Sequence, residues 1–113
     1  TKPKRGHKTF RIEPSAEIRN ALSNRFSVIE VIGLDRPGLL SEITGTLSDL
    51  SLDIASAHIT TFGEKVIDTF YVTDLTGGKI DSPTRMEAMR KRLIATLEGV
   101  SSEKAAKQRA AAE

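Results

Sequence analysis

The chain has 113 residues, enough for one domain with a single core, and it contains no cysteine, which excludes disulfides and thiolate metal sites. No apolar run approaches the roughly 18 residues that cross a bilayer, and no signal-peptide pattern is found, so we expect a cytoplasmic protein without membrane contact.

The net charge of +2 combines +5 over residues 1–11, +1 over residues 101–113 and −4 over residues 12–100. A basic arm attracts phosphate nonspecifically, which leaves nucleic-acid binding as an alternative. Such a segment is more often a solvated linker, and we predict no nucleic-acid partner.

The first part of the chain predicts a linker followed by two strands. Residues 1–7 combine proline, glycine and cations without apolar periodicity, as linkers do. Alternating apolar residues predict a strand over residues 8–13, which stops at Pro14 and therefore belongs at a sheet edge. The polar segment that follows predicts a helical turn over residues 16–22. The clearest strand pattern covers residues 25–33, where β-branched and aromatic residues alternate with polar ones.

Residues 37–50 predict an amphipathic helix. Its apolar face consists of Leu39, Leu40, Ile43, Leu47 and Leu50. Gly45 inside this helix costs about 1 kcal/mol relative to alanine. Such a glycine usually reflects close approach of a neighbouring backbone, and is otherwise simply tolerated.

Residues 52–79 predict a β-hairpin whose two strands are separated by Gly63 and Glu64. A two-residue loop pairs Phe62 with Lys65 and, counting back, Ala55 with Val72. This register places a mostly apolar set on one face: Ala55, Ala57, Ile59, Val66, Phe70 and Val72. The opposite face is mixed, which leaves room for a partner, and carries Ser56, His58, Thr60, Ile67, Thr69 and Tyr71.

The same register adds Asp68 to the apolar face. Because a buried carboxylate needs hydrogen-bond donors, we expect Asp68 to lie near the sheet margin and to accept hydrogen bonds.

A last helix begins after Ser82, which can cap it, with Pro83 at the first position, and it ends near Gly99. Residues 99–113 predict a flexible or frayed helical tail. The order strand, strand, helix, strand, strand, helix predicts an α+β, ferredoxin-like fold, with an antiparallel sheet and both helices on one face. The usual final strand is missing, and we predict that the N-terminal strand occupies its edge position.

The sequence contains no recognisable catalytic set. His7 lies in the linker, and the most economical interpretation of His58 is a hydrogen-bonded surface or interface histidine. No phosphate-binding loop, nucleophile motif or paired metal ligands are present, so we predict no enzyme activity, metal or cofactor for this chain.

The segment "GLDRPGLLSEI" is the best candidate for a binding site. Asp35 can cap the helix that follows, and Pro37 suits the first turn. Gly38 leaves the N–H groups of Gly38, Leu39 and Leu40 uncovered at the positive end of the helix, where a carboxylate can bind. The alternative is a plain strand-to-helix turn.

The motifs "DRPGLL", "LDIASAHITT" and "VIDTFYVTD" resemble ACT domains over about residues 26–97. A closer resemblance is to the C-terminal ACT repeat of the bifunctional uridylyltransferase/uridylyl-removing enzymes, which modify the PII nitrogen-signalling protein. It is carried by the segments "FRIEP", "FSVIEVIGLDRPGLLSEIT" and "GEKVIDTFYVTDLTGGKI". The catalytic motifs of those enzymes are absent. The chain also begins with threonine, and we therefore expect a regulatory piece of a longer enzyme, with its ACT domain over residues 8–98.

The resemblance implies an amino-acid effector, with glutamine expected, and no cofactor. One wall of its site would be Asp35, Arg36, Pro37, Gly38, Leu39 and Leu40. The other wall, from a sister ACT repeat or a second copy, would be Ile54, Ala55, Ser56, Ala57 and His58. PII would be the substrate of the parent enzyme. The alternative is an ACT module of another host enzyme, which senses a different amino acid or serves only as a dimerisation surface.

Overall fold

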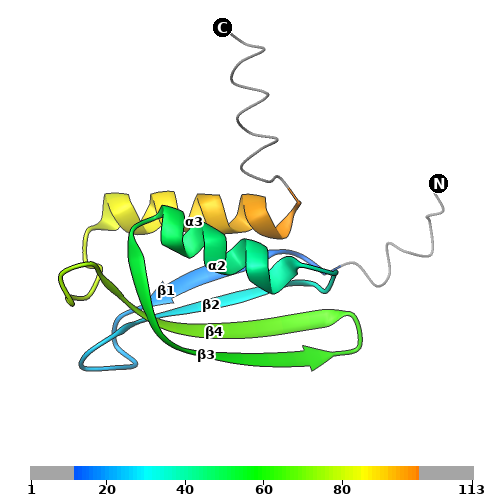
Figure 1. The fold of residues 1–113 in the computed structure, drawn as a ribbon, viewed down its shortest axis with the longest axis horizontal. Coiled ribbons are helices and arrows are strands. Elements are labelled where there is room, and N and C mark those ends of the chain that lie inside the picture. Colours follow the sequence, from blue (N-terminus) through cyan, green and yellow to red (C-terminus); the bar gives the residue numbers. More distant parts are fainter. Residues whose placement is uncertain (1–11, 100–113) are drawn as a thin grey trace, which may run out of the picture.

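The computed structural model describes residues 12–99, which form one antiparallel sheet with two helices on one of its faces (Figure 1). The elements are β1 (Ser15–Arg19), β2 (Ser27–Leu34), α2 (Leu39–Asp49), β3 (Leu52–Phe62), β4 (Lys65–Asp74) and α3 (Pro83–Leu97). The four strands follow the order β1-β2-β4-β3, so β1 and β3 are the edges. The predicted α+β, ferredoxin-like fold is confirmed. The N-terminal strand does occupy the edge beside β2.

That edge strand begins later than the sequence pattern predicts. Of the strand expected over residues 8–13, the described residues 12 and 13 are not in a strand, and the edge strand is Ser15–Arg19. The helical turn expected over residues 16–22 is wrong. Ala16 pairs with Val31 and is buried, because the side chains that alternate along β1 face the core. Pro14 precedes the strand, where its missing N–H interrupts no ladder. Residues 1–11 and 100–113, with the predicted linker, the start of the predicted strand and most of the tail, lie outside the described residues.

The β3–β4 hairpin has the predicted register from its turn as far as Ala57, which lies opposite Phe70. Beyond that point a β-bulge at Ala55 shifts the register, so Val72 lies opposite Ile54 and the predicted pairing of Ala55 with Val72 is wrong. The bulge inserts one unpaired residue, which a register counted outward from the turn does not anticipate.

The core lies between the two helices and strands β1, β2 and β4. Its strand residues include Ile29, Val31, Val66, Phe70 and Val72, all buried. Strand β3 is different, because every residue after Leu52 is exposed. The prediction that Ala57 and Ile59 join the packed face is therefore wrong in this single chain, since the helices leave most of β3 uncovered.

The close backbone approach expected at Gly45 is also not found, since a Cβ atom there would meet nothing within 4 Å. It occurs at Gly33 instead, where a Cβ atom would lie 2.9 Å from the Cδ2 atom of Leu97. At the start of α3, the Ser82 hydroxyl oxygen accepts a hydrogen bond from the N–H of Arg85, which confirms the predicted cap. Neither helix within residues 12–99 has the length and apolar content needed to span a membrane.

Candidate functional site

The loop between β2 and α2 is attached to the turn of the β3–β4 hairpin. The N–H of Asp35 donates to the carbonyl of Glu64 over 2.7 Å. Gly38 is the N-cap residue of α2, with φ of 80° and no side-chain cap, so the predicted capping role of Asp35 is wrong. With Gly38 as the N-cap, α2 begins at Leu39, four residues after Asp35, and the Asp35 carboxylate makes no hydrogen bond to the helix start.

The start of α2 presents backbone donors to an open surface. Of the three N–H groups expected to be free, that of Leu39 donates to the carbonyl of Arg36 over 3.1 Å. Those of Gly38 and Leu40 make no hydrogen bond to any residue between 12 and 99. A Cβ atom at Gly38 would meet nothing within 4 Å, and the Leu40 side chain is exposed. Two free donors at the positive end of an 11-residue helix can bind a carboxylate.

Arg36 turns toward the helices rather than toward this open surface. Its guanidinium donates to both carboxylate oxygens of Glu42, over 3.0 and 2.9 Å, and to the carbonyl of Thr96 over 2.7 Å. The hydrogen bonds between the two side chains raise the pKa of Arg36 and lower the pKa of Glu42. Arg36 therefore anchors the loop to α2 and to the end of α3, and its guanidinium is already engaged.

The five predicted residues of the strand wall divide between the two faces of β3. Ile54 and Ala57 point to the helix side, because their partners Val72 and Phe70 are core residues. Ser56 and His58 point to the other side, and Ala55 is the bulge residue. The His58 ring lies 5.5 Å from that of Tyr71 in an edge-to-face arrangement.

The loop and the strand wall do not meet within one chain. At the loop end of the sheet, Lys65 of β4 pairs with Leu34 of β2 and with Phe62 of β3, and these three residues form one row across the sheet. In a separate row, Tyr71 of β4 pairs with Val28 of β2 and with Ser56 of β3. Val28 and Leu34 are six positions apart along β2, a separation of about 20 Å at the usual strand rise. A site that uses both walls therefore needs a second copy of this domain or a similar one.

Asp68 is a further candidate for a functional residue, and its predicted position at the sheet margin is wrong. It lies in β4, a central strand, rather than at the sheet margin, and it is only 2% exposed. Its Oδ1 atom has no hydrogen-bond partner in the described residues, so the expected hydrogen bonds are also missing. Burial, and secondarily the charge of Asp35, raise the pKa of Asp68. The sequence did indicate the burial of Asp68, because the hairpin register already put this residue on the apolar face.

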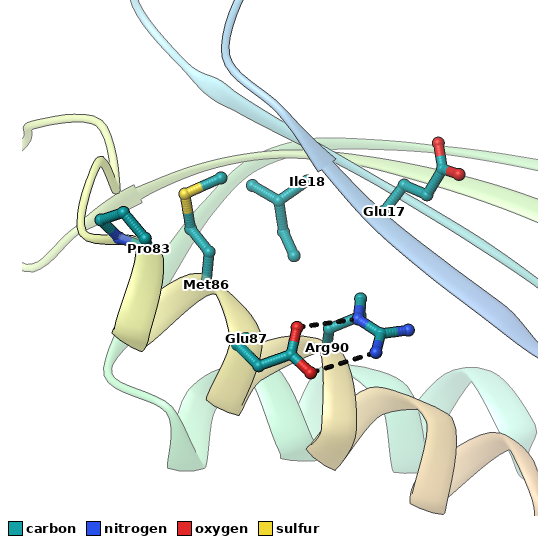
Figure 2. A pocket seen from close by; sticks show the side chains of 6 residues that line it. All are labelled: Glu17, Ile18, Pro83, Met86, Glu87 and Arg90. Carbon is teal, nitrogen blue, oxygen red and sulfur yellow. Dashed lines mark hydrogen bonds and ion pairs between the residues drawn. The ribbon is translucent and has the colours of Figure 1, made fainter.

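A concave surface with a volume of about 440 Å³ lies between β1 and α3, apart from the predicted site (Figure 2). Its lining residues are Glu17, Ile18, Pro83, Met86, Glu87 and Arg90. Ile18 and Met86 form an apolar end, and Glu87 pairs with Arg90 at the other, over 3.1 Å. The lining includes no residue of the predicted site. No group of metal-binding side chains is found among residues 12–99.

The ACT domain family model matches residues 27–93, which is more than half of the chain, and the chain therefore belongs to the ACT family. ACT domains are regulatory, non-catalytic modules that bind amino acids and commonly dimerise. The matched region runs from the start of β2 into α3 and includes both predicted walls of the site.

Proposed function

We propose that this chain is the glutamine-sensing module of a cytoplasmic bifunctional uridylyltransferase/uridylyl-removing enzyme, and that glutamine binding shifts the balance of PII modification. The observation that carries the proposal is the open start of α2, where the N–H groups of Gly38 and Leu40 are free and Asp35 precedes them in the same loop. A free amino acid has complementary charges, since its carboxylate suits the helix start and its ammonium group suits Asp35.

The second wall comes from another ACT unit that joins the free edge of β3. This strand has 11 residues and, among residues 12–99, pairs only with β4, so its other edge is open for pairing in the described part of the chain. An antiparallel pairing of two β3 strands centred on His58 would place Ile54 of the second copy opposite Phe62. Phe62 belongs to the loop-end row of the sheet, so the second copy would complete the site.

In this arrangement the effector acts by linkage. An amino acid that contacts both units stabilises their docked state by its difference in affinity for the docked and separated states. The parent enzyme then senses glutamine as a change in how its ACT units are docked.

A different host enzyme is the second candidate, with the module serving only for dimerisation. The long open edge of β3 favours it, because such an edge pairs with a second copy whether or not a ligand is present. The sequence upstream of residue 1 separates the two candidates: a nucleotidyltransferase region followed by an HD-type hydrolase region supports the uridylyltransferase.

Glutamine binding by two copies of the chain joined in tandem tests the site. Gly38→Leu covers the helix start, and Gly38→Asn is its control, because asparagine tolerates the left-handed conformation with a smaller side chain. We expect Asp35→Ala and Gly38→Leu to weaken binding at least ten-fold, and Gly38→Asn to weaken it less. Unchanged affinity in Asp35→Ala and Gly38→Leu would show that the loop is not the binding wall.

A further inference from the structure

Asp68 carries a buried carboxylate oxygen that no residue between 12 and 99 satisfies with a hydrogen bond. Within the part of the chain that the structure describes, its Oδ1 is the one buried side-chain polar atom without a hydrogen-bond partner. Side chains that alternate with it along β4, Val66 and Phe70, are fully packed in the core. A carboxylate at such a position is unfavourable unless a proton or a cationic group accompanies it.

Asp68 lies at the loop end of the sheet. Strand β4 starts at the hairpin turn, whose Glu64 carbonyl accepts the hydrogen bond from Asp35, and Asp68 is its fourth residue. The Asp35 carboxylate is near enough that its charge raises the pKa of Asp68. Asp35 and Asp68 thus both belong to the end of the sheet at which α2 begins with its free N–H donors (Figure 1). This pattern of one negative and one positive region matches a zwitterion.

The side of Asp68 that faces β3 borders the uncovered part of the sheet. Ile59 lies opposite Asp68 on β3 and is 45% exposed, and Ala57 and Thr61 on the same face are exposed as well. Asp68 is thus at the boundary between the closed core and an open strip of β3. A small molecule on that strip would have to displace the Ile59 side chain to reach Asp68.

We propose that Asp68 is an effector-binding residue, whose Oδ1 accepts a hydrogen bond from the α-ammonium group of an amino acid that sits on the start of α2. The inference rests on the proposed function and deepens it, because it adds a buried strand residue to Asp35 as a partner of the ammonium group. The effector supplies the donor that Oδ1 lacks, and an acid without the amine cannot do so. Where Asp68 is protonated in the free protein, ammonium binding releases that proton to solvent.

Calorimetry of the 113-residue chain with two probes tests this assignment. L-Glutamine carries the α-amine, and glutaramic acid is the same molecule without it. The wild-type chain is compared with Asp68→Asn and with Asp53→Asn, a control that removes an exposed carboxylate at the start of β3. We expect Asp68→Asn to weaken glutamine binding about ten-fold or more, the usual effect of losing a charge-assisted hydrogen bond, and to leave glutaramic acid binding unchanged. Asp53→Asn should change neither.

Proton release provides a second readout that a merely structural role would not produce. At mildly acidic pH, glutamine binding to the wild-type chain should release protons, seen as heats that vary with the ionisation enthalpy of the buffer, and Asp68→Asn should abolish this release. Equal glutamine affinity in wild type and Asp68→Asn would overturn the inference while the proposed function stands. Equal losses for both probes would overturn it too, because they show a structural role alone. Failure of the wild-type chain to bind any amino acid would overturn both proposals.

Discussion

Replacing Asp68 with asparagine should stabilise the folded chain at neutral pH. The wild-type side chain is buried, and its Oδ1 has no partner among residues 12–99. Asparagine has nearly the same shape but no charge, so the folded state no longer has to hold either a buried carboxylate or a proton on Asp68. The substitution therefore removes the contribution that ionisation of Asp68 makes to the free energy of unfolding.

The magnitude has an upper limit set by proton linkage. Keeping a carboxyl group with an ordinary pKa of 3.8 neutral at pH 7 costs about 1.4 kcal/mol for each of about three pH units, roughly 4 kcal/mol in total. An unsatisfied buried polar group costs about 1–3 kcal/mol, and the asparagine amide retains part of that cost. We therefore expect a gain of about 1–3 kcal/mol at pH 7, equivalent to a rise in Tm of several degrees.

The pH dependence has a defined sign. Because the pKa of Asp68 is raised in the folded state, wild-type stability is unaffected by this group below the unfolded-state pKa and falls as pH rises through the folded-state pKa. Urea unfolding of both proteins at pH 3 and pH 7 measures this. The stability difference should be small at pH 3 and full at pH 7. A variant that is less stable than wild type at pH 7, or a difference independent of pH, would refute the reasoning.

Three further substitutions have expected outcomes. Gly45→Ala should stabilise the chain by about 1 kcal/mol in urea unfolding, because the new Cβ meets nothing and the helix gains propensity. Arg36→Met should destabilise it by about 1 kcal/mol, since the half-exposed pair with Glu42 and the bond to the Thr96 carbonyl are lost. The Arg36–Glu42 contribution should fade on acidification, because Glu42 has a lowered pKa in the folded state. Ala57→Lys should abolish the dimerisation that we expect through β3, as measured by light scattering.

Each of these substitutions has a control. Gly33→Ala, in strand β2, places a Cβ atom 2.9 Å from the Cδ2 atom of Leu97, so a gain in stability there as large as at Gly45 would show that free space around the new Cβ atom does not decide the outcome. Glu42→Gln should lose the same pH dependence of stability as Arg36→Met, because it removes the titrating carboxyl group. Dimers that persist in Ala57→Lys would show that the free edge of β3 is not the interface.

The parts of the fold that depend on local signals follow from the sequence. The switch from alternating to helical spacing after residue 34 predicts both β2 and α2, and Ser82 followed by Pro83 predicts the start of α3. Strand β1 was misplaced because its five residues contain only two core-facing side chains, too few to outweigh a helical interpretation.

The parts that depend on tertiary arrangement do not follow from local patterns. Asp68 was placed on the correct face, but its burial depends on β4 lying between β2 and β3. The engagement of Arg36 depends on Thr96, a residue 60 positions away in sequence, which contacts it only when α3 packs beside the loop. The bulge at Ala55 leaves one residue of β3 without a partner on β4, which counting from the turn does not capture.

The central claim is that this ACT domain binds an amino acid at the start of α2 and the edge of β3. Isothermal titration of the chain with L-glutamine and with the other amino acids, at concentrations where light scattering shows dimers, tests it most directly. We predict saturable binding of glutamine at one site per ACT unit, and tighter dimers in its presence. Absence of binding to any amino acid by the dimeric chain would contradict the claim.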